Sequence, residues 1–518
     1  MPVQLPHQAG FEGLKTSLLL GLMLSRTTIA QATDWPNYRG PTHDGVSAER
    51  INKNWTGAVT NPVWLVQLTN GLTSFSVSGG RAFTQVARNT NGGNREVCLA
   101  LSATNGTVLW STIVDATASY PNGGVGTTDD GPRSTPVVAA GSVYVLTSYL
   151  KLLRLNATNG AIIWSNNLVA TYGGTVIPWQ NSASPVIENG LIFLNANAGS
   201  QRLIALRTSD GSLAWRSQNE AMTHSTPVLA TIHGVRQLIF AAQSGLVSLD
   251  PLTGSLLWKF PISYNGISLA ASPVVCGDIV LVTSDYGYGA TATRIVSSNS
   301  FFTANSLWND FGLGSHWSTP VSFQGAFFGQ FEPDNETAEL RCIDATTGEQ
   351  RWAQSGFGRG STILIGTNLL VVTEACELVL VEANTNAFVE LARFQAIPNY
   401  ASFNNKCWNA LAISDGQVFV RSTAYAARYD LSVPDLRLDL PQLAPASKLD
   451  LTIRTMTGTP LDSNRLTGME VRATTNAALS PGVWPKLTNA LVYSNGVVRV
   501  TDVDAGLIRR FFIVSEPK

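Results

Sequence analysis

Hydrophobic and polar positions alternate in a short unit that recurs along the chain. In its clearest copy, residues 152–164, apolar residues at strand spacing lead into a polar turn, and a second short apolar run ends on tryptophan. The turn residues and Gly160, which suits a left-handed backbone, predict a β-hairpin. Further copies lie at 99–110, 203–215, 246–258 and 340–352, with weaker ones at 294–308 and 378–391. A hairpin that recurs in this way indicates a repeat architecture.

A second apolar pattern precedes each hairpin. It starts at Ser/Thr-Pro or a similar pair and forms an apolar strand, then a Gly or Asn turn and another apolar strand, as in STPVVAAGSVYVLTS from Ser134. Eight such blade starts are present, at Ser74, Ser134, Ala183, Ser225, Ala271, Ser318, Ser361 and Trp408. With its hairpin, each unit supplies four short strands, which make one blade of a β-propeller. We therefore predict an all-β chain with an eight-bladed propeller over residues 61–434.

The last blade lacks a strand that ends on tryptophan, whereas an isolated apolar strand, 63–68, precedes the first blade. Because a ring of sheets must be joined at its ends, we expect this N-terminal strand to complete the eighth blade and close the propeller. The blade tryptophans from Trp110 to Trp352 are 43 to 54 residues apart. This regularity favours a structural role, with each ring packed between successive sheets and its indole N–H bonded to the neighbouring backbone. The blade tryptophans are Trp64, Trp110, Trp164, Trp215, Trp258, Trp308 and Trp352.

Residues 1–32 have the pattern of a secretory signal peptide. Lys15 precedes a short apolar core, and Ala30-Gln31-Ala32 fits a cleavage site. The apolar core is too short to span a bilayer stably. We therefore expect a periplasmic or secreted protein with no transmembrane segment in the mature chain.

Residues 33–60 form an N-terminal segment in which Trp-Pro and Gly-Pro pairs predict irregular, anchored structure. Arg39, His43 and Asp44 are open to a functional role. A plug that packs Trp35 and Tyr38 on the propeller is the favoured interpretation.

Residues 435–518 carry no blade motif. Their alternating apolar and polar stretches predict a small C-terminal β-sandwich-like module, within the usual size range of a domain.

Charge and cysteine content exclude several classes of function. Only 13% of the residues are charged, the net charge is −1, and no run of Lys or Arg is present. This argues against nucleic acid or an anionic membrane surface as a partner. The five cysteines form no CxxC and no adjacent pair, so metal and redox motifs of that kind are absent. An odd number leaves at least one without an intramolecular partner, and a Cys376–Cys407 bridge between neighbouring blades stays open.

Candidate functional residues gather just before the first strand of several blades, where they would ring one mouth of the channel. Hydrogen-bond donors around an aromatic floor suit an anion, a quinone or a sugar acid. No carboxylate or third histidine recurs at that register, so we predict no metal site. The competing interpretation is that these groups bond to backbone carbonyls and close the channel. The candidates are Arg133, His224, His316, Trp317, Arg359, Lys406 and Trp408.

The pattern A-T-x-G-x-x-x-W at 157–164 and 345–352 resembles the repeat of the pyrroloquinoline-quinone (PQQ) enzymes. The chain is similar to the secreted, non-dehydrogenase branch of PQQ-like propeller-repeat proteins, as in WPNYRGP at 35–41 and GPRSTP at 131–136. The resemblance implies eight blades and, for the dehydrogenases, PQQ with calcium. This chain lacks the adjacent cysteines of those enzymes, and their calcium ligands and catalytic Asp find no counterpart. It is similar as well to outer-membrane assembly scaffold propellers, without their lipid-anchor cysteine.

Three functions follow as hypotheses. The first is a binding or scaffold protein for a protein partner or a small anionic or sugar ligand, without PQQ-dependent catalysis. The second is a quinoprotein-type oxidoreductase with Arg133, Arg359 and the histidines on the quinone carboxylates. The third is a carbohydrate-binding protein. The missing adjacent cysteines favour the first.

Overall fold

The computed structural model describes residues 34–516, apart from 91, 117, 121–130, 265–268, 300, 333–336, 399–406, 440, 446–447, 477 and 505–509. The predicted signal peptide and Lys406 lie outside the described residues. The chain divides into two compact units, one ending at Ser432 and the other beginning at Val433. Within the described part, strands dominate, the one α-helix is α1 (Leu168–Tyr172), and no helix has the length and apolar character to cross a membrane.

The first unit consists of sheets of four antiparallel strands, as the all-β prediction requires; one sheet gains a short parallel fifth strand, and the last is completed by a strand from the N-terminal side. Its first four sheets contain β3 (Ser76–Ser78), β4 (Arg81–Thr90), β5 (Gly93–Ser102), β6 (Val108–Asp115), β7 (Val137–Ala139), β8 (Ser142–Leu146), β9 (Lys151–Asn156), β10 (Ile162–Asn167), β11 (Val186–Glu188), β12 (Leu191–Asn195), β13 (Leu203–Arg207), β14 (Leu213–Ser217), β15 (Val228–Ile232), β16 (Val235–Ala242), β17 (Gly245–Leu249) and β18 (Leu256–Pro261).

The sheets that follow contain β19 (Val274–Cys276), β20 (Ile279–Ser284), β21 (Gly289–Ser298), β22 (Phe301–Asp310), β23 (Val321–Phe323), β24 (Ala326–Phe331), β25 (Glu339–Asp344), β26 (Gln350–Gln354), β27 (Ser361–Ile365), β28 (Asn368–Val372), β29 (Glu377–Glu382), β30 (Glu390–Gln395), β31 (Ala412–Ser414), β32 (Gln417–Arg421) and β33 (Tyr425–Asp430). The described residues of this unit thus form eight sheets.

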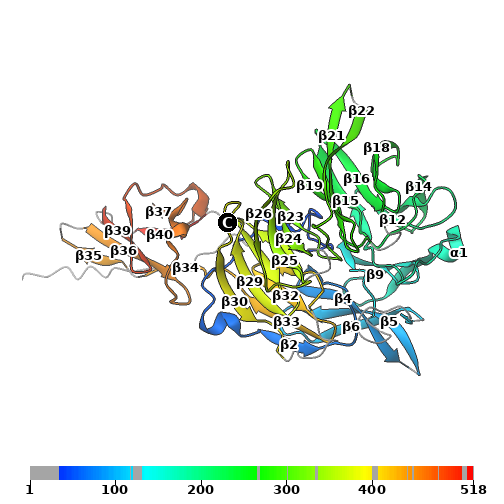
Figure 1. Cartoon of the computed structure of the whole chain (residues 1–518). Helices are drawn as coiled ribbons and strands as arrows, with labels where there is room; N and C mark the ends of the chain where they lie inside the picture. Colours follow the sequence, from blue (N-terminus) through cyan, green and yellow to red (C-terminus); the bar gives the residue numbers. More distant parts are fainter. Residues whose placement is uncertain are drawn as a thin grey trace, which may run out of the picture. The chain divides into compact units, whose positions relative to one another are not determined.

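An N-terminal strand joins the last sheet to the start of the chain. β2 (Trp64–Gln67) pairs antiparallel with β33, with Trp64 opposite Arg428, and the two lie side by side in Figure 1. The first strands of successive sheets also touch: β3 contacts β7, β7 contacts β11, and β31 contacts β3. The sheets therefore form a closed ring, with the closing strand that the sequence predicts.

A ring of hydrogen bonds links the blade starts around the centre, and it explains the Ser/Thr-Pro motif. At each junction, a Ser or Thr hydroxyl of one blade bonds to a backbone group of the neighbouring blade. These backbone groups would otherwise be buried without a partner. The bonds are Ser74 N to Thr135 Oγ1 (3.0 Å), Thr135 N to Ser184 Oγ (2.9 Å), Ser184 N to Thr226 Oγ1 (2.9 Å), Ser225 Oγ to Ala271 O (2.9 Å), Ser272 N to Thr319 Oγ1 (3.0 Å), Ser318 Oγ to Gly360 O (2.6 Å), Leu411 N to Ser361 Oγ (3.4 Å) and Ser74 Oγ to Ala410 O.

The blade tryptophans link neighbouring sheets further from the centre. Six of them donate their indole N–H to a backbone carbonyl in the hairpin turn of the next blade, as predicted. Trp258 is the exception, since its N–H bonds to Gln237 Oε1 at 2.7 Å. The next repeat has no tight glycine turn, because β21 and β22 extend into ten-residue strands. In the described residues, the Gln237 side chain therefore takes the place of the turn carbonyl as the acceptor for Trp258.

The N-terminal segment touches several blades. Trp35 is buried and bridges Val77 of the first blade through two backbone hydrogen bonds, of 2.9 and 2.8 Å. The Arg39 guanidinium donates to the carbonyl oxygens of Thr319 (2.8 Å) and Pro320 (2.6 Å) in the sixth. β1 (Val46–Ser47) then pairs parallel with β27 in the seventh. The segment also contains a 3-10 turn, η1 (Gly57–Thr60).

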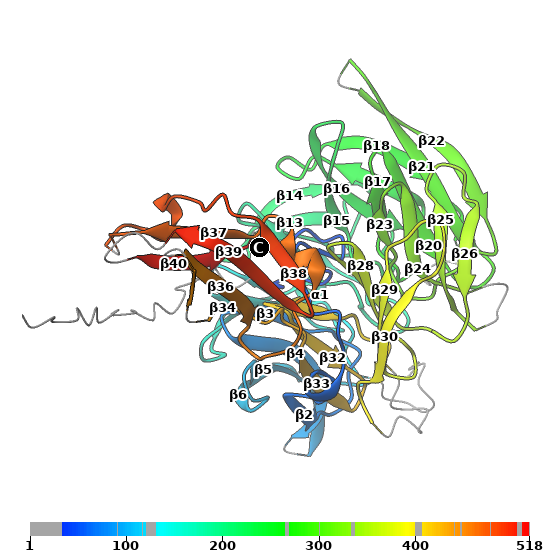
Figure 2. The ribbon, with the colours of Figure 1, turned by 90° about the vertical axis from the view of Figure 1, so that its left-hand side faces the viewer.

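The second unit contains a sheet of β34 (Leu436–Leu438), β35 (Gln442–Ala444), β36 (Lys448–Thr455), β38 (Leu491–Ser494) and β39 (Val497–Asp504), and a pair of β37 (Glu470–Thr474) with β40 (Phe511–Ser515). Figure 2 shows β36 and β39 side by side. Residues of both sheets, among them Leu451, Val471 and Val498, share one buried core. Two short 3-10 helices, η2 (Ser463–Leu466) and η3 (Pro481–Val483), complete this unit.

Candidate functional site

A cavity of about 360 Å³ lies at the mouth where the blade starts converge. This volume is within the range of small-molecule sites. Six of the candidates that the sequence predicts line it, and the seventh, Lys406, falls outside the described residues. Tyr38 and Arg39 of the N-terminal segment line it as well. The six are Arg133, His224, His316, Trp317, Arg359 and Trp408.

Aromatic rings form much of the cavity wall. The ring centroids of Trp317 and Trp408 are 4.6 Å apart, and the Arg359 guanidinium carbon lies 5.9 Å from the centroid of Trp317. Trp179 and Tyr286 also line the cavity, with exposed fractions of 40% and 53%. The cavity therefore presents flat, partly exposed aromatic faces to a ligand.

Arg133 and His224 brace the loop that carries Trp179. Arg133 Nη1 donates to the Trp179 carbonyl at 2.7 Å, and His224 Nε2 bonds to the Pro178 carbonyl at 3.1 Å. Trp179 and Gln180 both have φ of 59°, a backbone conformation that costs free energy and needs such support. Both side chains thus bond to backbone carbonyls, which agrees with that part of the competing interpretation.

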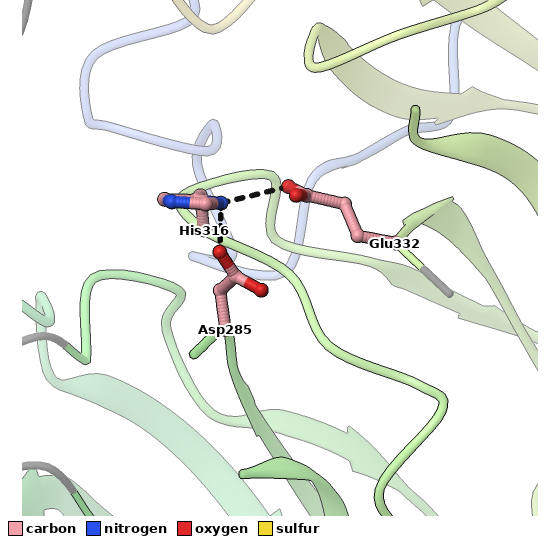
Figure 3. Close-up of side chains that lie close together, drawn as sticks. All are labelled: Asp285, His316 and Glu332. Atoms are coloured by element: carbon pink, nitrogen blue, oxygen red, sulfur yellow. Dashed lines mark hydrogen bonds and ion pairs between the residues drawn. The ribbon is translucent and has the colours of Figure 1, made fainter. Parts of the chain in front are cut away.

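A charged cluster stands behind the aromatic wall. Nδ1 of His316 lies 2.6 Å from Asp285 Oδ2 and 2.9 Å from Glu332 Oε1, as Figure 3 shows. Arg359 donates from Nε and Nη2 to the two oxygens of Glu332, at 2.9 and 2.7 Å. Next to it, the Trp408 indole N–H donates to Glu374 at 3.1 Å. The charge of Arg359 is therefore largely compensated by the protein itself.

Hydrogen bonding outweighs burial in setting the charges of this cluster. Burial raises the pKa of Asp285 and of Glu332, but bonds from His316, and from Arg359 to Glu332, hold both pKa values below their usual range. Burial lowers the pKa of His316, whereas its bonds to the two carboxylates raise it above the usual value. The bond to Glu332 raises the pKa of Arg359. These bonds favour the charged forms of His316 and of the two carboxylates.

The three carboxylates are not among the residues predicted from the sequence. At the blade-start register no carboxylate recurs, but Asp285, Glu332 and Glu374 follow the second strands of three consecutive blades, β20, β24 and β28. An antiparallel second strand returns to the mouth from which the first strand starts. An acidic residue just past the second strand in three consecutive repeats is the sequence signal that identifies them.

The three polar residues of the N-terminal segment lie in different settings. Arg39 is buried, which lowers its pKa, and its bonds to Thr319 and Pro320 fix it beneath the cavity. His43 is 6% exposed, and burial together with the charge of Arg236 lowers its pKa to about 4. Asp44 is exposed and accepts hydrogen bonds from Thr42 and Val46 of its own loop. Of these three, only Arg39 reaches the cavity wall in the described residues.

Similar proteins match both the sequence and the fold. A family model described as "Outer membrane protein assembly factor BamB" matches residues 93–354. The BamB of Yersinia pestis is 27% identical over 210 residues, which is 38% of this chain and 48% of that protein. The BamB of Moranella endobia is 26% identical over 273 residues, 50% of this chain and 62% of that protein. The chain thus spans about half of the first relative and three fifths of the second.

Among solved structures, the quinohemoprotein alcohol dehydrogenase of Comamonas testosteroni is similar, with a TM-score of 0.53 and 12% identity over 80% of this chain and 83% of that one. At this identity the likeness concerns the fold alone. The matched family model covers half of the chain, and the repeated four-stranded sheets agree with it. The chain therefore belongs to the PQQ-like β-propeller repeat family whose model is described as outer membrane protein assembly factor BamB.

Proposed function

We propose that this protein is an extracytoplasmic binding protein whose central cavity takes a carbohydrate, with sugar acids preferred. The relatives support a propeller that acts by binding or as a scaffold. The placement outside the cytoplasm rests on the signal-peptide pattern of residues 1–32. Amino-terminal sequencing of the exported protein, with a first residue near Thr33, would support that placement, and a retained leader would count against it.

The chemistry of the cavity wall carries the proposal. The apolar C–H face of a sugar ring packs on an indole or phenol ring, and its hydroxyls exchange hydrogen bonds with serine and threonine. Arg359 at the wall uses Nε and Nη2 for Glu332, so its Nη1 is the group that can donate to a single carboxylate on the sugar. The aromatic residues that line the cavity are Tyr38, Trp179, Tyr286, Trp317 and Trp408, and the hydroxyl residues are Ser74, Thr135, Ser182, Ser184, Thr226, Ser318, Thr319 and Ser361.

PQQ with calcium, which the fold family implies, suits the cavity less well. PQQ carries three carboxylates and needs cationic partners for them. Arg359 is paired with Glu332, and Arg133 donates to a backbone carbonyl. Three protein carboxylates already stand at the same mouth. The side chains present therefore do not fit a tricarboxylate ligand.

Isothermal titration tests the proposal. A galacturonic acid trisaccharide is expected to bind with a micromolar Kd, more tightly than a neutral trisaccharide. Trp317→Ala and Trp179→Ala should each weaken binding at least about tenfold, because each removes an aromatic face. Leu252→Ala, in an exposed turn outside the cavity, is the control and should bind as the parent protein does. Absence of saccharide binding would contradict the proposal, and stoichiometric PQQ binding with calcium would favour an oxidoreductase.

A second candidate function is a scaffold for a protein partner, as the names of the relatives indicate for those proteins. β21 and β22 reach past the neighbouring blades in both views, and Phe301 on β22 is 79% exposed (Figures 1 and 2). Chemical cross-linking of the parent chain and of Phe301→Ser in the source cells tests this function. A single partner, captured by the parent chain and lost with Phe301→Ser, would favour the scaffold.

A further inference from the structure

We propose that Asp285, His316 and Glu332 form a binding site for a first-row divalent transition-metal ion such as Zn²⁺. The three residues converge from separate places in the fifth and sixth blades. Asp285 directly follows β20, Glu332 directly follows β24, and His316 lies in the loop between β22 and β23. One nitrogen and two carboxylate oxygens all lie within 4.8 Å of one another (Figure 3).

The positions of the donor atoms suit a small ion. Zn²⁺ binds imidazole nitrogen and carboxylate oxygen at about 2.0–2.2 Å, so tetrahedral donors lie roughly 3.4 Å apart. His316 Nδ1 is 2.6 Å from Asp285 Oδ2 and 2.9 Å from Glu332 Oε1. An ion in place of the Nδ1 proton needs each carboxylate oxygen to move away from His316 Nδ1 by less than about an ångström. Zinc sites that bind a small molecule typically have three protein ligands, and of the three residues here His316 also lines the cavity.

The surroundings hold the ligands in place. Asp285 and Glu332 are 5% and 3% exposed, so solvent competes little for their oxygens. The backbone of Glu332 is fixed by a 2.7 Å hydrogen bond to Gly314. Arg359 bonds to both Glu332 oxygens and so orients this ligand, as outer partners of metal ligands commonly do. An imidazole with two carboxylates favours zinc, manganese or iron over calcium and magnesium, which prefer oxygen ligands alone.

The test uses the full chain and the metal alone, so it is independent of the proposed sugar ligand. Protein stripped with a chelator is titrated with Zn²⁺ by calorimetry, with Ca²⁺ as the competing hard cation. We expect one Zn²⁺ per chain with a micromolar or tighter Kd, and no comparable heat from Ca²⁺. Glu332→Gln and His316→Ala should each weaken Zn²⁺ binding at least about a hundredfold. His233 lies outside the cluster and bonds to the Ile295 carbonyl. The control variant His233→Ala should therefore leave the Zn²⁺ affinity unchanged.

Two results would overturn the site: a stripped parent protein that takes up no Zn²⁺, or Zn²⁺ binding that both cluster variants retain. A second measurement covers the case in which a variant fails to fold. Co²⁺ bound to the parent protein should give the visible absorption of a nitrogen and oxygen site. A sulfur-to-metal charge-transfer band would instead place the ion at a cysteine such as the partly exposed Cys276 and contradict the assignment.

Discussion

At the scale of single residues, the repeat motif acts through contacts between one blade and the next. The turn glycine of a hairpin has positive φ, and in five repeats a Cβ added there would lie 2.6–2.9 Å from the tryptophan of the preceding blade. Glycine is thus required twice, for its backbone conformation and for the close approach of the indole. The glycines are Gly106, Gly160, Gly211, Gly254 and Gly348.

Two glycines of the third blade allow the effect of positive φ to be distinguished from the effect of the indole contact. Gly211 has φ of 72° and its added Cβ would lie 2.9 Å from Trp164, whereas Gly190 has φ of 78° with its nearest neighbour atom at 3.8 Å. Both substitutions to alanine incur the strain of positive φ, about 1 kcal/mol, but only Gly211→Ala displaces the indole. We expect Gly211→Ala to lower the free energy of unfolding by about 1–3 kcal/mol more than Gly190→Ala. Equal urea midpoints for the two variants would refute the indole contact.

Glu96 supplies a pH dependence at the same scale. It is fully buried between the Tyr120 hydroxyl (2.6 Å) and the Ser148 N–H, and burial raises its pKa to about 7. The folded chain holds this proton more tightly than the unfolded chain does. The resulting stability is therefore fully present below the unfolded pKa, near 4.5, and is lost as the pH rises through about 7. Its size is about 3 kcal/mol.

Urea unfolding at pH 5 and pH 8 checks this expectation. In Glu96→Gln the carboxyl cannot ionise, so the variant should lose most of that pH dependence and unfold at a higher urea concentration than the parent at pH 8. The exposed Glu349→Gln is the control and should follow the parent at both pH values. A Glu96→Gln variant that keeps the full pH dependence would place the effect elsewhere.

At the scale of elements, the junction between the last blade and the first differs from the others. No chain segment runs directly from one of these blades to the next, and strand pairing closes the ring there. β2 comes from the N-terminal side of the chain, and β33 ends the propeller. Trp64 and Arg428 both donate to the carbonyl of Ala103 in the first blade, at 3.0 and 2.6 Å. Removal of β2 thus opens a sheet edge and removes the Trp64 bond from the contacts between the last blade and the first.

Deletion of residues 61–69 tests the closure. We expect the melting transition of the propeller to fall by more than about 10 °C, because the ring loses a strand and its closing tryptophan. The unit from Val433 onward has its own core, so its transition should stay in place and serve as an internal control. Calorimetry that shows an unchanged propeller transition would contradict closure by β2.

At the scale of the whole molecule, the sequence identifies the repeat but only part of the site. Blade starts, turns and tryptophans are local patterns, so the propeller and its closing strand follow from spacing alone. Arg359 and His316 are likewise placed at the mouth by their position before a strand. Their partners Asp285 and Glu332 belong to other segments, and only the radial arrangement of the sheets brings these four charges together. The residues before the first strands, taken alone, therefore predict a more positive cavity than the structure has, because the acidic partners follow the second strands.

The central claim is that the cavity binds a sugar. Its most direct test is the structure of a crystal of the protein soaked in the galacturonic acid trisaccharide. The account predicts ordered sugar in the central cavity, with one ring against Trp317 and Trp408 and its carboxylate near Arg359. Ordered sugar on the unit beyond Val433, with the cavity filled by solvent alone, would contradict the cavity as the binding site.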